Sequence, residues 1–69
     1  MSDLKTQFGR RLRVLRKRAD LTQEELAEST GLTIESISNI ERGIFGPKFD
    51  NLEKIAKVIG VEVKELFDF

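Results

Sequence analysis

The sequence predicts an all-α fold built from five helices, with no β-strand. Apolar residues recur at three- and four-residue steps, which is the period of an amphipathic helix. Residues typical of helix starts precede these segments, and glycines follow several of them. A single proline interrupts the 69 residues, and no repeat or low-complexity stretch is present. We therefore expect one compact domain over residues 1–69.

The first predicted helix spans about residues 3–19. Its apolar residues fall at helical spacing and should form its buried side. These residues are Leu4, Phe8, Leu12, Leu15 and Ala19. The arginines of the same segment are then left on the outer side of the helix.

Two short capped helices with a glycine between them come next. Thr22 and Glu25 form a capping box, in which a hydroxyl and a carboxylate bond the free amides of a helix start. A second helix is therefore expected over Gln23–Thr30, and Gly31 can adopt the left-handed conformation that ends it. Thr33 caps the third helix. This spacing is typical of a helix-turn-helix, which places its second helix in the DNA major groove.

The third helix, which runs to about residue 42, has two unlike sides. At 100° per residue, one side holds Ile37, Ile40, Glu41 and Ile44. The other side holds Glu35, Ser36, Ser38, Asn39 and Arg42. Amide side chains can bond adenine, hydroxyls can bond several bases, and apolar groups can touch the thymine methyl. We interpret the polar side as a surface that contacts bases, with a merely hydrated surface as the alternative.

The last two helices follow a loop over residues 43–49 that contains two glycines and Pro47. Asp50 and Glu53 offer a second capping box, and Gly60 ends the fourth helix. Its buried side should contain Leu52, Ile55, Ala56 and Ile59. A short fifth helix is expected over Lys64–Asp68.

The composition excludes several classes of function. Cysteine and histidine are both absent, so disulfides, thiolate or imidazole metal sites and the usual nucleophile–base pairs are not available. We therefore expect neither an enzyme nor a metal or other cofactor. No apolar run approaches the ~18 residues of a membrane span, and we expect a cytoplasmic protein.

The charge of the chain is strongly polarised although its formal net charge is zero. Residues 1–19 carry a net charge of +6, and the remaining 50 residues carry −6. A chain of this kind can present a basic surface to phosphates while it stays neutral overall. The alternative is that the basic first helix is a solvated surface paired with acidic residues elsewhere.

The helix-turn-helix resembles that of the lambda and 434 Cro/repressor family, also called the xenobiotic-response-element family of bacterial and phage regulators. The residues at matching spacing are Gln23, Leu26, Ala27, Gly31, Leu32, Ile37 and Ile40. The likeness continues through GRRLRVLRKR before them and IERGIFGPKFDNLEKIAKVIGVEVKELF after them, and so covers nearly the whole chain. It implies a compact five-helix, lambda-repressor-like domain whose second and third helices form the helix-turn-helix.

The resemblance also implies roles for individual residues. The positions that contact bases in the family correspond to Thr33, Ile34, Glu35, Ser36 and Asn39. The positions that contact DNA phosphates correspond to Thr22, Gln23, Arg42 and Lys48, and the glutamine also supports the helix that contacts the bases. Arg16 and Glu41 match a structural ion pair between the first and third helices.

Some positions depart from the family pattern and leave alternatives open. Ile34 could be core or could touch a thymine methyl, and Glu35 could accept from cytosine, exclude other bases or touch no base. Asp20 replaces a glycine after the first helix, where left-handed backbone is required. Ile44 and Phe45 are apolar where the family often has polar residues. Packing inward is the default for both, and exposure would mark a contact with another protein or with the DNA sugar and backbone.

The resemblance implies a homodimer on a pseudo-palindromic DNA site, because such domains bind two half-sites about 34 Å apart. The candidate dimer contacts are the apolar residues near the C-terminus, namely Val61, Val63, Leu66, Phe67 and Phe69. The alternative is that all of them except Phe69 complete the core of one subunit.

Two functional hypotheses follow for this sequence. The first is a small dimeric transcriptional regulator, such as a repressor, that binds double-stranded DNA. The second is an antitoxin-type or other interaction module that uses the same fold to bind a protein partner. Exposure of Ile44, Phe45 or Phe69 would favour the second hypothesis.

Overall fold

The computed structural model describes residues 3–69, and in this range all regular secondary structure is helical, with no strand. It contains α1 (Leu4–Arg18), α2 (Gln23–Thr30), α3 (Ile34–Glu41) and α4 (Phe49–Ile59). A short 3₁₀ helix, η1 (Val63–Phe67), follows them. The all-α prediction is confirmed, and the first two residues of the expected domain lie outside the described range. Within that range, none of the helices has both the length and the apolar character to cross a membrane.

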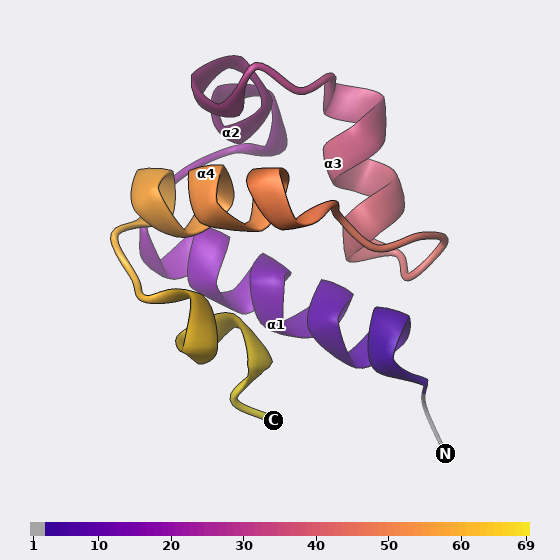
Figure 1. Cartoon of the computed structure of the whole chain (residues 1–69). Coiled ribbons are helices and arrows are strands. Elements are labelled where there is room, and N and C mark those ends of the chain that lie inside the picture. The colour runs from indigo at the N-terminus through magenta and orange to yellow at the C-terminus, as the bar shows by residue number, and fades with distance from the viewer. Residues whose placement is uncertain (1–2) are drawn as a thin grey trace.

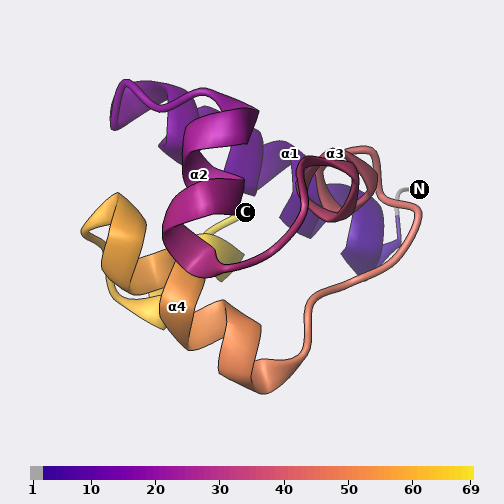
Figure 2. The same cartoon turned by 90° about the horizontal axis from the view of Figure 1, so that it is seen from above.

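The helices pack around a shared centre (Figure 1). Helix α2 packs against α3 and α4, while α1 packs against α3 and η1. A short turn joins α2 to α3, and the longer loop from α3 to α4 runs along the edge of the molecule (Figure 2). The pair α2–α3 therefore rests on two supports, because α1 fixes α3 and α4 fixes α2.

The core draws apolar side chains from every helical segment. The buried apolar residues are Phe8, Leu12, Leu15, Leu26, Ala27, Ile37, Ile40, Leu52, Ile55, Ala56 and Leu66. Each fully buried leucine or isoleucine contributes about 1.5–3 kcal/mol relative to an exposed one. The predicted stripe of α1 is confirmed at its centre, but Leu4 is exposed and lines a surface groove. Ala19 is half-buried and follows the end of α1 as its C-cap.

Helices α1, α2 and α3 each begin with a side-chain cap. Asp3 Oδ1 accepts a hydrogen bond from the Thr6 amide at 2.9 Å, which lowers the pKa of the Asp3 carboxyl below its ordinary value of 3.8. Because the folded-state pKa is lowered, this cap is complete above the ordinary pKa and is lost as pH falls through the lowered one. The capping box of Thr22 and Glu25 is confirmed by hydrogen bonds of 3.0 and 2.9 Å in the two directions.

Left-handed backbone closes the turns on both sides of α2. Gly31 ends α2 with φ = 77°, which a glycine adopts without the steric cost that a side chain brings. Asp20 also has a positive φ, of 62°. The departure from glycine at this position therefore leaves the left-handed turn after α1 in place.

The predicted capping box of α4 is wrong. The helix begins at Phe49, one residue before the expected cap, and its N-cap residue Lys48 makes no side-chain cap hydrogen bond. Asp50 therefore lies inside the first turn, where its carboxylate still faces the positive end of the helix dipole. The apolar stripe is unaffected because it depends on residue spacing, and Leu52 and Ile55 are buried as predicted.

The short helix expected over Lys64–Asp68 is the 3₁₀ helix η1 (Val63–Phe67), so the structure has four α-helices in the described range and a fifth is not confirmed. The Glu65 amide bonds the Glu62 carbonyl, and the Asp68 amide bonds the Glu65 carbonyl. These are three-residue steps, which are common in short helical segments. The segment nevertheless delivers Leu66 into the core with no exposed surface.

Candidate nucleic-acid interface

The rotation of α3 is fixed by two fully inserted isoleucines. Ile37 is 0% and Ile40 is 2% exposed, so the opposite side of α3 faces outward. Glu35 is exposed on that side, and Asn39 is half-buried. The polar strip expected from the sequence is thus present at the surface of the monomer.

The first turn of α3 holds two linked hydroxyl groups. Thr33 caps the helix by accepting a hydrogen bond from the Ser36 amide at 3.0 Å. Its hydroxyl also donates to Ser36 Oγ at 2.9 Å. Thr33 is exposed and Ser36 is half-buried, so both residues have surface that solvent can reach.

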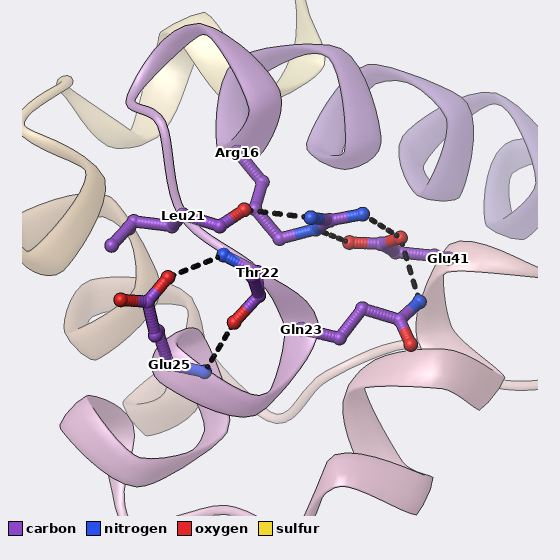
Figure 3. A network of polar contacts seen from close by, with 6 residues as sticks. All are labelled: Arg16, Leu21, Thr22, Gln23, Glu25 and Glu41. Carbon is purple, nitrogen blue, oxygen red and sulfur yellow. Dashed lines mark hydrogen bonds and ion pairs between the residues drawn. The ribbon is translucent and has the colours of Figure 1, made fainter.

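A buried ion pair ties α3 to α1 (Figure 3). Arg16 Nε donates to Glu41 Oε2 at 2.6 Å, and Arg16 Nη2 donates to Glu41 Oε1 at 3.1 Å. The Arg16 and Glu41 side chains are only 8% and 3% exposed. The third guanidinium nitrogen, Nη1, donates to the Leu21 carbonyl at 2.7 Å. Arg16 and Glu41 thus form a bidentate ion pair, which fixes the orientation of α3 relative to α1.

Gln23 extends this network to the start of α2. Its Nε2 donates to Glu41 Oε1 at 3.0 Å (Figure 3). An amide nitrogen has two hydrogens, so one remains for a further acceptor. Gln23 can therefore brace Glu41 and bond a phosphate at the same time.

The other three residues expected to contact phosphates lie at the ends of helices. Thr22 is the exposed N-cap of α2, Arg42 is the exposed C-cap of α3, and Lys48 is the exposed N-cap of α4. In the sequence, Thr22 and Gln23 precede α3, whereas Arg42 and Lys48 follow it. Two basic residues of α1 are engaged within the molecule, because Arg16 is buried against Glu41 and Arg11 bonds the Glu65 carbonyl at 2.9 Å.

The sequence pattern did not point to one polar residue that lies close to α3. Asn51, in the first turn of α4, lines the same surface notch as Ser36 and Lys48. The chain between Ser36 and Asn51 includes the irregular loop after α3, so no periodic pattern relates the two positions. Only the tertiary arrangement brings Asn51 to α3.

Three apolar positions near α3 are exposed. Ile34 is 48% exposed, which removes the core alternative for this residue. Ile44 and Phe45 are also exposed, so the default expectation that they pack inward is wrong. Both residues belong to the loop between α3 and α4, and neither is part of the core.

The candidate dimer residues divide into two groups. Leu66 is part of the core, so its assignment as a dimer contact is wrong, and Val61 packs partly against the same core. Val63, Phe67 and Phe69 are exposed, which leaves them available to another molecule. The 3₁₀ turn separates these groups because it points Leu66 inward.

The chain matches known proteins over most of its length. The model of a family described as helix-turn-helix matches residues 12–66. Control protein C.BamHI of Bacillus amyloliquefaciens is 39% identical over 69 residues, which cover 99% of this chain and 85% of the relative. Control protein C.MunI of Mycoplasma sp. is 41% identical over 68 residues, which cover 97% and 92%.

Solved structures with the same arrangement include a controller and a repressor. The restriction-modification controller protein C.AhdI of Aeromonas hydrophila has a TM-score of 0.86 at 39% identity, over 90% of this chain and 94% of that one. The P22 c2 repressor protein, solved in complex with a synthetic operator, has a TM-score of 0.82 at 28% identity. That match covers 88% of this chain and 92% of the repressor chain.

Proposed function

This chain belongs to the helix-turn-helix family, and on that basis we propose that it is a sequence-specific, DNA-binding transcriptional regulator. Helix α3 enters the major groove, and its outward strip contacts base edges. The observation that carries this proposal is the orientation of α3, whose isoleucines are inserted in the core while Glu35 and Asn39 stay at the surface. The similarity to control proteins and to a repressor solved with its operator supports it.

Selection of bound duplexes from a random library tests this function directly. We expect a pseudo-palindrome whose half-sites lie about one helical turn, roughly 34 Å, apart. Binding should weaken steeply as salt concentration rises, because neutralised phosphates release counterions. Failure to enrich any motif would contradict the proposal.

Asn39 is proposed to contact a base through its amide group. Asn39→Ala should cost about 1–3 kcal/mol of binding free energy and relax the preference at one base pair of each half-site. The measurement is binding to the selected duplex and to its single-base variants. Ser29→Ala, at an exposed position of α2, is the control and should bind like the wild type. An equal loss on every duplex would argue against a base contact.

Arg42 and Lys48 are proposed to contact phosphates. Arg42→Gln and Lys48→Gln should each weaken binding to all duplexes, and each should flatten the plot of log affinity against log salt by about one unit per half-site. Lys57→Gln, near the other end of α4, removes the same charge from an exposed position. If Lys57→Gln changes the slope as much, the effect is one of net charge and the assigned contacts are wrong.

We propose that the regulator acts as a two-fold dimer through an apolar patch formed by Leu4, Phe49, Phe67 and Phe69. The first three line one groove of about 220 Å³, and the Phe67 and Phe69 rings lie 6.3 Å apart. Phe49 is 85% exposed. An exposed apolar surface of this kind marks an interaction site, and a two-fold contact uses the same patch on both subunits.

Phe49→Lys should therefore dissociate the dimer. Each subunit would lose the burial of one phenyl group, about 1.5 kcal/mol or more, so the dimer dissociation constant should rise at least about a hundredfold. Sedimentation equilibrium measures it. Val14→Lys places the same charge at an exposed apolar position of α1 and should leave the dimer intact. An unchanged dissociation constant for Phe49→Lys would exclude this patch.

The second candidate function is a module that binds a protein partner. The exposure of the adjacent residues Ile44 and Phe45, which follow α3, favours this function. Neighbouring exposed apolar side chains are typical of a surface that contacts another protein. An absence of any enriched duplex in the library selection would support this function over the first one.

A further inference from the structure

A notch lined by both apolar and polar residues lies between α3 and the start of α4. It has a volume of about 220 Å³, several times the roughly 30 Å³ that a water molecule occupies in the liquid. Its polar side chains are Ser36, Lys48 and Asn51, the rest of its lining is apolar, and no carboxylate among the described residues lines it. Each of these three side chains can donate a hydrogen bond. The notch therefore suits an acceptor that carries negative charge.

The hydroxyl of Ser36 has a proton available for a hydrogen bond to a ligand. Thr33 Oγ1 accepts from the Ser36 amide and gives its one proton to Ser36 Oγ at 2.9 Å. The proton of Ser36 is not used in this pair. A hydroxyl that accepts a hydrogen bond becomes a stronger donor, because linked hydrogen bonds polarise one another.

Ser36 also points away from the base-facing strip. At 100° per residue, Ser36 lies on the flank next to buried Ile40, and both residues line the notch. Asn39 lies near the middle of the outward side, opposite the isoleucines. The two polar residues of α3 thus face different parts of a DNA duplex, because the flank of a helix in the major groove faces a sugar–phosphate strand.

We propose that Ser36 and Asn51 hold one DNA backbone phosphate in the notch beside Lys48, so that Ser36 positions α3 and does not select bases. This proposal rests on the proposed DNA-binding function. It changes the role that the resemblance implies for Ser36, and it assigns a role to Asn51. A phosphate oxygen is an acceptor only, which matches a notch whose polar side chains can all donate.

Ser36→Ala with chemically altered duplexes tests the role of Ser36. The duplex is the one selected by the wild-type protein, with single phosphates replaced in turn by the uncharged methylphosphonate. Ser36→Ala should weaken binding about tenfold per half-site, as expected for a hydrogen bond to a charged group. The loss should be equal on single-base variants of the duplex and should vanish when one particular phosphate is replaced.

The salt dependence adds a second readout. Because serine carries no charge, Ser36→Ala should leave the salt slope unchanged, whereas Lys48→Gln should flatten it. A loss confined to one base pair, or no loss at all, would overturn the role proposed for Ser36. If the wild-type protein selects no duplex, the proposed function itself fails. If it selects a duplex and Ser36→Ala binds that duplex like the wild type, only the role of Ser36 fails, so the two failures are distinguishable.

Asn51→Asp tests the other side of the notch. The substitution keeps the shape of the side chain but places a negative charge where the phosphate would bind. A carboxylate in the first turn of α4 interacts favourably with the helix dipole, so thermal stability should be kept while affinity falls more than tenfold. Lys57→Gln lowers the net charge by the same amount and should bind much more tightly than Asn51→Asp. Equal affinities of these two variants would overturn the role of Asn51.

Discussion

Glu41→Ala is expected to destabilise the protein by about 3–5 kcal/mol, because it leaves the guanidinium of Arg16 buried without its partner. The Glu41 carboxylate accepts two hydrogen bonds from Arg16 and one from Gln23. Of the three hydrogen bonds described for the Arg16 guanidinium, only the one to the Leu21 carbonyl would remain after removal of the Glu41 carboxylate. A domain of this size has only a few kcal/mol of stability, so Glu41→Ala should be largely unfolded near room temperature.

Thermal and urea unfolding followed by circular dichroism measure this loss. Arg16→Ala should be destabilised similarly, since it leaves the Glu41 carboxylate in the same low-polarity site. The double variant Arg16→Met, Glu41→Leu removes both charges together and should recover most of the loss, because paired apolar side chains can replace a buried ion pair. Melting temperatures of the single variants equal to that of the wild type would show that the pair contributes nothing to stability.

The ends of α2 and the start of α3 were predictable because local chemistry determines them. Thr22 with Glu25 caps one helix, Gly31 ends it, and Thr33 caps the next, all through contacts within a few residues. The last segment was not predictable in the same way. A five-residue segment can form α-helical or 3₁₀ hydrogen bonds, and the packing of Leu66 against the other helices is not visible in a local pattern.

The candidate site was predictable to the extent that it lies on one helix. The spacing of Ile37 and Ile40 fixes which side of α3 faces out, and therefore the exposure of Glu35. The notch required knowledge of tertiary structure, because Asn51 reaches it from α4. The sequence also could not separate Ser36 from the residues of the outward strip. That separation requires knowing that the start of α4, with Asn51, lies beside Ser36.

Gly9→Ala is expected to displace α3 from α1 and to destabilise the protein by at least about 2 kcal/mol. A Cβ atom at this position would lie 2.4 Å from the Ile40 carbonyl oxygen and 2.6 Å from that of Glu41. Both atoms belong to the backbone, so no side-chain rotation relieves the contact. Alanine favours a helix by about 1 kcal/mol over glycine, and this gain should be outweighed by the forced separation of the helices.

Gly46→Ala is the matched control, because a Cβ atom there would meet nothing within 4 Å. Its stability should be unchanged or slightly raised, since alanine restricts the unfolded chain. Gly9→Ala should also bind the selected duplex more weakly under conditions where it remains folded, because Ile40 and Glu41 belong to the helix that contacts DNA. Equal unfolding free energies for the two glycine variants would mean that α1 and α3 can separate at little cost, and that their close contact does not hold α3 in place.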